Sequence, residues 1–382
     1  MTELQIDGGL SRVLVLWADP RAENYGLRVL AEGIRILVSS GEAPPPEVVF
    51  HSHNTPDSPL TRRMVLADAV RRAGPILRYL KQFDLIVDTG GGDSFTDIYG
   101  PRRLILQAYM HFAARRAKVP IVLAPQTIGP FGARVTSHIG RSVLKHADLV
   151  CSRDPESSRY AEQLGRTPDF ETSDVAFCLP SVPMAKSHDV ILNVSGLLWH
   201  PNPHVDFQYY RSSITSLVER LLDDGRSVVL LPHVIGGEGL DNDVPACEAV
   251  YDLYRTRGAR LVVPKDLTKM REAIGSGAVL IGSRMHACLN AISVGTPAIA
   301  WSYSRKFAPL LDAIKYEYHF DLRDEESDLV GKTLALIATD NLDVLAEACT
   351  EINGLATGTF AGLEALFREL DGVRESNRGS AL

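Results

Sequence analysis

Residues 278–307 have the sequence AVLIGSRMHACLNAISVGTPAIAWSYSRKF, in which two apolar runs flank a helical segment. The runs Ala278–Ile281 and Pro297–Trp301 are short and apolar throughout, which predicts buried strands of a parallel sheet. A helix is expected between them, because strand, helix and strand in this order form the crossover unit of α/β proteins.

Charged and aromatic side chains follow both predicted strands. Arg284 and His286 come after the first strand, and Tyr303, Arg305 and Lys306 come after the second. The carboxyl ends of parallel strands are where open α/β sheets bind ligands. Two strand ends are therefore expected to direct cations to one crevice, where they suit a small, highly charged anion and a proton transfer beside it. A surface loop with scattered charge is the alternative interpretation.

Short apolar runs alternate with helical segments along most of the chain. Helical spacing covers residues 27–38, 60–83 with an interruption near Gly74 and Pro75, 104–118 and 343–370. This alternation predicts doubly wound parallel sheets with helices on both faces. The predicted strands are residues 12–17, 47–51, 84–88, 119–124, 148–152, 189–194, 227–231, 260–263, 278–281 and 297–301.

The chain length of 382 residues favours two domains. The best linker candidate is Leu179–His188, because Pro180 and Pro183 interrupt it and it has no periodicity. We expect a Rossmann-like domain over residues 1–180 and a second over 181–340, with the two domains facing a cleft. A helical segment over 341–374 and a flexible tail over 375–382 are expected to follow.

The composition, with 45% hydrophobic and 23% charged residues, is that of an ordinary globular protein. The formal net charge of -7 argues against nucleic acid or an acidic membrane surface as the general partner, so local cations must meet any bound anion. The five cysteines are dispersed and include no C-x-x-C pair, which is typical of cytosolic proteins. No window suggests a signal peptide or a membrane span, so we expect a cytoplasmic protein.

The stretch DTGGGDSFTD, residues 88–97, places three glycines after a predicted strand. Gly91 and Gly92 let a ligand approach the backbone and are expected to leave amide donors available for an anion. A carboxylate at Asp93 or Asp97 can hold or deprotonate a sugar hydroxyl. A tight turn, and for Asp93 a helix cap, are the alternatives. The glycine spacing fits neither nucleotide-binding fingerprint.

Three further stretches bring polar residues to strand ends. APQTIGPF (124–131) offers Gln126, and VCSRDPESS (150–158) offers Arg153 beside a helix start, where it would complement a phosphate or carboxylate. LPHVIGGEGLDND (231–243) brings His233 and Asp243. The alternatives are a structural turn for Gln126, a solvated Arg153 and a structural or exposed His233. The histidines and carboxylates lack zinc-site spacing, and nothing else requires a metal.

Taken in order, these stretches resemble the polysaccharide pyruvyl transferase family. The resemblance covers most of residues 24–307 and is most specific in the last stretch, where R-x-H is followed by G-x-P and then Y-x-x-K. It implies a GT-B-like fold of two Rossmann-like domains, with the acceptor on the first, the donor on the second and a carboxyl-terminal helix returning to the first.

The resemblance also implies an activity. A pyruvyl transferase would move pyruvate from phosphoenolpyruvate onto a sugar of a cell-surface polysaccharide or its lipid-linked precursor, forming a ketal and releasing phosphate. It would use phosphoenolpyruvate as donor substrate and need no cofactor. Peripheral association with the inner face of the membrane and assembly into a homo-oligomer are both compatible with this activity.

The family's functional positions can be carried over residue by residue. Arg284 and His286 fall on the R-x-H motif, Lys306 on the lysine of Y-x-x-K, Arg153 on a family arginine, and Asp97 on the aspartate after the glycines. We expect Arg153, Arg284 and Lys306 to hold the donor anion, His286 to protonate carbon three, and Asp97 to orient or deprotonate the attacking hydroxyl. The other expected substrate-binding residues are Tyr303, Gly91, Gly92, Asp93, Gln126, His233 and Asp243.

Three rival functions fit the same residues. A sugar-nucleotide glycosyltransferase would share the fold, which by itself does not determine the reaction. A noncatalytic glycan-binding relative of the enzyme is the second alternative, and an enzyme that uses the same donor on a small molecule is the third.

Overall fold

The computed structural model describes residues 10–41, 44–52, 64–65, 67–68, 74–181, 184–236, 239–304 and 307–369. The chain forms two compact units. The first comprises Met1–Pro20, Leu30–Cys178 and Thr357–Leu382, and the second comprises Arg21–Val29 and Leu179–Ala356. The units are discontinuous in sequence, because a short segment near the amino terminus belongs with the second unit.

The first unit is built on a parallel six-stranded sheet in the order β2-β1-β3-β4-β5-β6. Its central strands are buried along their whole length, as expected for a sheet covered on both faces. The strands are β1 (Arg12–Leu16), β2 (Glu47–His51), β3 (Leu85–Asp88), β4 (Ile121–Gln126), β5 (Leu149–Ser152) and β6 (Phe170–Glu171).

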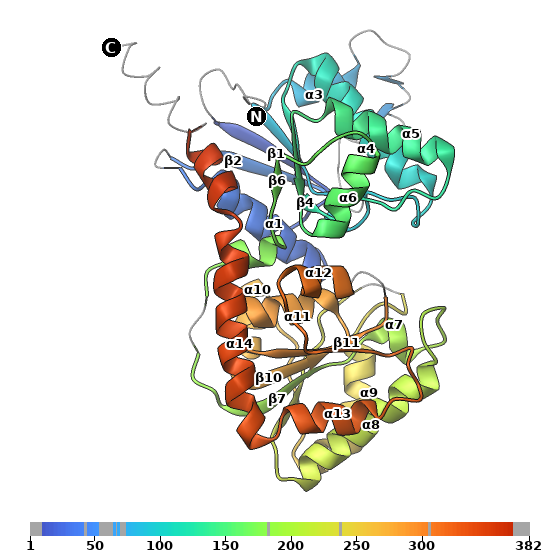
Figure 1. Cartoon of the computed structure of the whole chain (residues 1–382), viewed down its shortest axis with the longest axis vertical. Coiled ribbons are helices and arrows are strands. Elements are labelled where there is room, and N and C mark those ends of the chain that lie inside the picture. Colours follow the sequence, from blue (N-terminus) through green and yellow to red (C-terminus); the bar gives the residue numbers. More distant parts are fainter. Residues whose placement is uncertain are drawn as a thin grey trace. The chain divides into compact units, whose positions relative to one another are not determined.

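Right-handed crossovers determine which face of this sheet each helix covers. The connections from β3 to β4 and from β4 to β5 run the same way along the sheet, so α4 and α5 lie side by side on one face (Figure 1). The connection from β1 to β2 runs the opposite way and places α1 on the other face. The helices are α1 (Tyr25–Val38), α3 (Pro75–Leu80), α4 (Pro101–Ala117), α5 (Arg134–His146) and α6 (Pro155–Gln163), with 3-10 turns η1 (Gly90–Gly92) and η2 (Val175–Cys178).

The second unit contains another parallel six-stranded sheet, in the order β12-β11-β10-β7-β8-β9. This is the strand order of dinucleotide-binding domains, in which the direction of winding reverses between the two central strands, here β7 and β10. The strands are β7 (His188–Asn193), β8 (Val228–Leu230), β9 (Arg260–Leu261), β10 (Gly277–Gly282), β11 (Ala298–Ser302) and β12 (His319–Asp321).

Helices connect these strands and follow the last of them. In α14, the Cys349 thiol lies 3.7 Å from the carbonyl of Ile292, and Asn353 Nδ2 donates to the carbonyl of Ser293 at 3.3 Å, so this helix packs on α11. The helices are α7 (Gly196–Trp199), α8 (Phe207–Asp223), α9 (Val244–Tyr254), α10 (Leu267–Gly275), α11 (Met285–Ser293), α12 (Phe307–Ala313), α13 (Leu329–Leu336) and α14 (Thr339–Gly358), with the 3-10 turn η3 (Arg255–Arg257). No described helix is both long and apolar enough to span a membrane.

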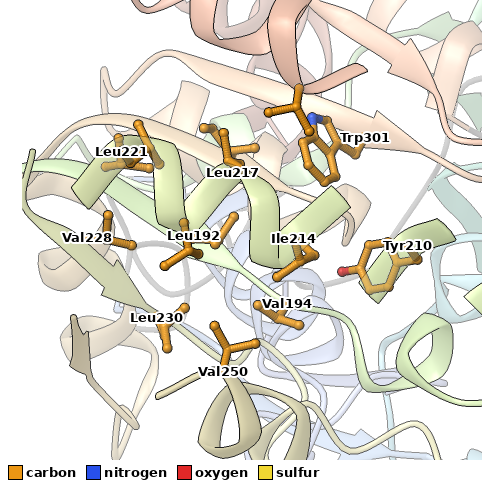
Figure 2. Packing of buried hydrophobic residues seen from close by; sticks show 14 of the residues in the cluster. Leu192, Val194, Tyr210, Ile214, Leu217, Leu221, Val228, Leu230, Val250 and Trp301 are labelled. Atoms are coloured by element: carbon orange, nitrogen blue, oxygen red, sulfur yellow. The ribbon is translucent and has the colours of Figure 1, made fainter. Parts of the chain in front are cut away.

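The core of the second unit lies between α8 and its sheet. Tyr210, Ile214, Leu217 and Leu221 recur at helical spacing along one side of α8 and are fully buried. Figure 2 shows them with Leu192, Leu230, Val250 and Trp301 of the same cluster. Burial of each such side chain stabilises the fold by about 1.5–3 kcal/mol, so this helix face holds the sheet that carries the site described below.

The ten strands predicted from sequence are all confirmed, with ends shifted by at most two residues. The edge strands β6 and β12 were not predicted, because Phe170–Glu171 and His319–Asp321 lie in polar sequence without an apolar run. The helix predicted over 343–370 is interrupted by a turn at residues 359–360. Of the helix predicted over 60–83, residues 64–65, 67–68 and 75–80 are helical, and most of the remaining earlier part lies outside the described residues.

We predict that Leu217→Ala lowers the stability of the second unit by about 2–5 kcal/mol, because it leaves a cavity under α8. Chemical denaturation followed by circular dichroism measures this loss. Leu253→Ala, at a position 60% exposed on α9, is the matched control and should shift stability by less than about 0.5 kcal/mol. Equal effects of the two substitutions would contradict the packing described here.

Candidate functional site

The candidate site lies at the carboxyl edge of the second unit's sheet, where the winding reverses. β7 ends at Asn193, β8 at Leu230 and β10 at Gly282, so the segments that follow these strands meet above the sheet. Open α/β sheets bind ligands at this position. The geometry confirms that the stretches around His233 and Arg284 reach one edge of one sheet.

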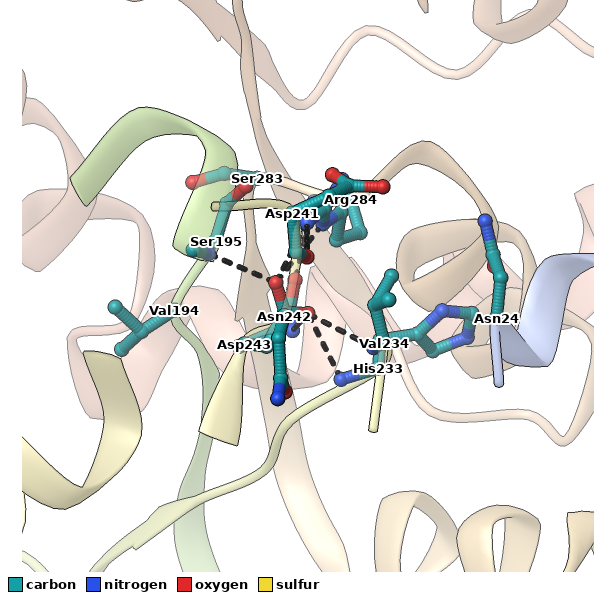
Figure 3. A network of polar contacts seen from close by, with 12 residues as sticks. Asn24, Val194, Ser195, His233, Val234, Asp241, Asn242, Asp243, Ser283 and Arg284 are labelled. Atoms are coloured by element: carbon teal, nitrogen blue, oxygen red, sulfur yellow. Dashed lines mark hydrogen bonds and ion pairs between the residues drawn. The ribbon is translucent and has the colours of Figure 1, made fainter. Parts of the chain in front are cut away.

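The carboxylate of Asp243 holds these segments together (Figure 3). Its side chain is fully buried, and Oδ1 accepts the backbone N–H of Gly196 at 2.8 Å. Oδ2 accepts the N–H groups of His233 and Val234, both at 3.0 Å. A buried carboxylate must be satisfied by donors, so the turns after β7 and β8 are held against the residue that starts α9.

Arg284 completes this network and joins it to the end of β10. Its Nε and Nη2 donate to Asp243 Oδ1 at 3.1 and 2.7 Å. Its Nη1 donates to Asp241 Oδ1 at 2.7 Å, and Nη2 also donates to the Asp241 carbonyl at 2.6 Å. Burial lowers the pKa of Arg284, but the carboxylates of Asp243 and Asp241 outweigh burial and hold its pKa above the ordinary value. The predicted donor anchor is thus already neutralised by two acids.

His233 is buried beside this network. Figure 3 shows its ring turned away from Asp243 toward Asn24, and Nε2 has no hydrogen-bond partner among the described residues. Burial, followed by the nearby charges of His286 and Arg284, holds the pKa of His233 well below its ordinary value. His233 is therefore a neutral imidazole at physiological pH.

His286 lies in the first turn of α11 and is partly exposed, unlike His233. Its ring packs against Gly26, where an added Cβ would lie 2.8 Å from His286 Nδ1. Asn24 fixes this turn, because its Oδ1 accepts the N–H of Gly26 at 2.8 Å and its backbone pairs with Val234. The segment Asn24–Gly26 therefore forms one wall of the site around both histidines.

Tyr303 follows β11 and packs against other aromatic rings. The ring of Tyr303 lies 5.4 Å from that of His204 and 5.5 Å from that of Phe307, and Tyr303 packs against the core of the second unit. Lys306 lies outside the described residues, and its role as a donor anchor stays a prediction.

The glycine-rich turn of the first unit differs from the anion site that the sequence suggested. Gly90 N–H donates to Asp88 Oδ1 at 2.9 Å, Gly91 N–H to Thr89 Oγ1 at 3.2 Å and Gly92 N–H to the Thr89 carbonyl at 2.8 Å. The expectation that Gly91 and Gly92 leave amide donors for a ligand was wrong, because the turn satisfies its own backbone. Glycine is needed here by its positive φ and by Gln126 Oε1, which would lie 1.8 Å from a Cβ at Gly90.

Gln126 and Asp93 support the same turn. Gln126 is fully buried, and its Nε2 donates to the Asp88 carbonyl at 3.0 Å, so it braces the turn rather than facing a ligand. Asp93 accepts from the hydroxyl of Tyr99 at 3.1 Å, and it does not cap a helix start.

Asp97 has the capping function that the sequence analysis weighed for Asp93. Its Oδ2 accepts from the N–H groups of Gly132 and Ala133 at 2.7 and 3.2 Å and from Thr136 Oγ1 at 2.6 Å, at the start of α5. Burial raises the pKa of Asp97, but these hydrogen bonds outweigh burial and lower it overall. A carboxylate with a lowered pKa is a weaker base, which counts against the expected deprotonation of a hydroxyl.

Arg153 is neither a ligand-facing nor a solvated arginine. It is 1% exposed, its Nη1 pairs with Asp174 at 2.7 Å, and its Nε and Nη2 donate to Thr127 Oγ1 at 3.0 and 2.7 Å. The guanidinium therefore ties together the segments that follow β4, β5 and β6. Its predicted role as a donor anchor has no support from these contacts.

Three residues of the site were not predicted as functional from the sequence: Asn193, Asp241 and Gly26. Asn193 Oδ1 accepts the N–H of Arg284 at 3.1 Å, and its Nδ2 donates to the Leu231 carbonyl at 3.0 Å. An asparagine that ends an otherwise apolar strand was the available signal for Asn193. Among the described residues, no group of three or more His, Cys, Asp or Glu could hold a metal ion.

Comparison with known proteins places the chain among polysaccharide enzymes. The family model described as polysaccharide pyruvyl transferase matches residues 24–305. The amylovoran biosynthesis protein AmsJ of Erwinia amylovora is 24% identical over 247 residues, which are 59% of this chain. The matched part spans 58% of that relative's length.

Solved structures share the fold at low sequence identity. A putative UDP-N-acetylglucosamine 2-epimerase from Listeria monocytogenes has a TM-score of 0.59 at 13% identity, covering 94% of this chain and 97% of its own. MnaA of S. aureus in complex with UDP has a TM-score of 0.58 at 13% identity, covering 92% and 94%. HepE of Anabaena in complex with UDP has a TM-score of 0.54 at 11% identity, covering 98% and 100%. These similarities confirm the GT-B-like fold.

We predict that Asp97→Ala lowers stability by about 1 kcal/mol at neutral pH, because α5 loses its cap. The pKa of Asp97 is lowered by folding, so its stabilisation is present above the unfolded pKa of about 3.9 and lost as pH falls through the folded value. Denaturation curves of both proteins should therefore converge in acid. Asp252→Ala, at an exposed carboxylate on α9, is the control and should cost less than about 0.5 kcal/mol. A pH-independent difference would contradict the capping role.

Proposed function

Because the chain belongs to the polysaccharide pyruvyl transferase family, we propose that it moves pyruvate from phosphoenolpyruvate onto a sugar of a polysaccharide or its precursor. The product is a pyruvate ketal, and one phosphate is released. The match to AmsJ supports a biosynthetic role of this kind. The observation that carries the proposal is His286, a partly exposed imidazole in the first turn of α11 at the switch point of its sheet.

The reaction needs one proton donor at carbon three of phosphoenolpyruvate. A sugar hydroxyl adds to carbon two, and His286 gives its proton to carbon three as the double bond is lost. A second hydroxyl then forms the other carbon–oxygen bond at carbon two, phosphate leaves with the electron pair of its carbon–oxygen bond, and the hydroxyl protons return to His286 and to phosphate. The atoms balance without an oxidant or a reductant.

The neutral state of His233 is compatible with His286 as the proton donor. A second cationic imidazole close to His286 would disfavour the protonated acid, and burial keeps His233 uncharged. The site then contains one partly exposed imidazole next to one that is buried and neutral.

Donor binding in this proposal differs from the three-cation site expected at first. Arg153 is enclosed in the first unit, and four of the five N–H groups of Arg284 are directed to Asp241 and Asp243. We assign Arg284 to positioning the start of α11, whose first-turn amides suit a phosphate or carboxylate. Lys306 remains the proposed cationic anchor.

We expect His286→Gln to lower phosphate release from phosphoenolpyruvate with a glycan acceptor by about 10²–10⁴-fold, since glutamine cannot supply the proton. Phosphate release and the gain of pyruvate mass on the acceptor measure the turnover. His188→Gln, at the amino end of β7, is the control and should keep the wild-type rate. Wild-type turnover in His286→Gln would disprove the assignment, and turnover of UDP-sugars in place of phosphoenolpyruvate would disprove the proposed donor.

We also expect Gly26→Ala to lower kcat about tenfold or more while the protein stays folded, because the new methyl group displaces the His286 ring. Gly354→Ala is the matched control, since a Cβ there meets no atom within 4 Å. Steady-state kinetics on both variants measure the effect. If the two variants have the same kcat, the wall formed by Asn24–Gly26 does not position the acid.

A further inference from the structure

The distribution of charge along the chain is uneven in one region. From Ile98 to Ala147 the sequence contains no aspartate or glutamate, although the protein has 47 of them and a formal net charge of -7. The same stretch contains eight lysines and arginines, namely Arg102, Arg103, Arg115, Arg116, Lys118, Arg134, Arg141 and Lys145. These residues belong to α4, α5 and the turns beside them.

The outer side of α5 is a basic stripe. Arg134, His138, Arg141 and Lys145 recur at intervals of four, three and four residues, so they lie on one face of the helix. Val135, in the first turn of α5, is 71% exposed. None of the stripe's arginines or its lysine is ion-paired with a described carboxylate. Like charges at this spacing repel each other, so the stripe costs stability in the isolated protein.

The outer side of α4 combines apolar and basic residues. Ile105 and Phe112 are 53% and 55% exposed and are separated by seven residues, or two helical turns. Arg116 lies one turn further, with its guanidinium 5.7 Å from the centre of the Phe112 ring. Because α4 and α5 lie side by side on one sheet face, their outer sides form one surface, which we call the α4–α5 face (Figure 1).

Helix dipoles do not explain these cations. Arg115, Arg116 and Lys145 lie near helix carboxyl ends, where cations are favourable. Arg102, Arg103 and Arg134 lie in the first turns, where cations are unfavourable and where neither helix has an acidic residue. Arg103 has a partner within the chain, because its Nη1 donates to Ser94 Oγ at 3.3 Å. Arg102 and Arg134 form no ion pair with a described carboxylate, which favours an anionic partner outside the chain.

A cavity of about 570 Å³ lies where the carboxyl ends of α4 and α5 meet. Arg115, Lys118, Lys145, His146 and Arg166 line it, and Asp148 is the one carboxylate among the lining residues. Arg166 is ion-paired with Asp169, so the other lining cations remain for a ligand. Asp148 accepts the backbone N–H of Ile121 at 2.8 Å, so part of its charge is already satisfied. The cavity is large enough for a phosphate-bearing headgroup.

We propose that the α4–α5 face docks on an anionic phospholipid bilayer. The basic stripe and the cavity would meet lipid phosphates, while Ile105, Phe112 and Val135 would enter the interfacial layer. The half-exposed apolar side chains favour a bilayer over a soluble polyanion, which needs the charges alone. The face lies wholly in the first unit, and the proposal does not depend on the donor used in the second.

The test is co-sedimentation of the full chain with vesicles of phosphatidylglycerol mixed into phosphatidylcholine. Each cation near the surface contributes about fivefold to partitioning, so Arg134→Gln/Arg141→Gln/Lys145→Gln should bind on the order of 100-fold more weakly. Arg220→Gln/Lys315→Gln/Lys332→Gln removes the same charge from exposed positions of the second unit and should bind like the wild type. Binding should also fall as salt is raised.

The apolar part is tested by Phe112→Ser, with Leu253→Ser, 60% exposed on α9, as its control. Phe112→Ser should weaken vesicle binding several-fold, and Leu253→Ser should not. Thermal unfolding of every variant shows that it is folded. The proposal is overturned if the wild type does not sediment with anionic vesicles, or if both triple variants lose binding equally. It is also overturned if the protein binds a soluble acidic glycan as tightly as the vesicles and Phe112→Ser changes neither glycan binding nor vesicle binding.

Discussion

The second unit depends on the burial of one carboxylate. Asp243 has no contact with solvent, so its charge must be met by donors from the protein. The donors come from the turns after β7 and β8 and from Arg284 after β10. Three strand ends are thereby fixed against one another at the point where the sheet changes its direction of winding. Removing one member of such a buried pair typically costs about 3–5 kcal/mol, because the other is left uncompensated.

The charged and titratable residues expected to bind substrate differ in whether they are already paired. Arg284 and Arg153 form ion pairs with buried carboxylates, and these pairs hold loops together. His286 is different, because it is partly exposed and stands next to a neutral, buried His233. In the proposed reaction, one imidazole and the backbone at the start of α11 do the chemistry, and the charged network supports them.

In the first unit, side-chain hydrogen bonds also fix the turns that follow the strands. The glycine-rich turn after β3 satisfies its own amides, and Gln126 braces it from β4. Asp97 then fixes the start of α5. On the outer side of α5, Arg134, Arg141 and Lys145 form no ion pair with a described carboxylate. A surface that repels itself is a different kind of site from the buried network, and it suits a large anionic partner.

The alternation of strands and helices, the strand ends at which polar residues gather, and the family could all be read from the sequence. Strand periodicity and short motifs are local, so one chain segment contains the information. Which polar groups are available to a ligand depends on the folded structure. Whether Arg153 or Asp97 can meet a ligand depends on partners far away in sequence, namely Asp174 and Thr136. The position of Asn24–Gly26 beside His233 and His286 is equally nonlocal, because strand pairing and burial bring these segments together.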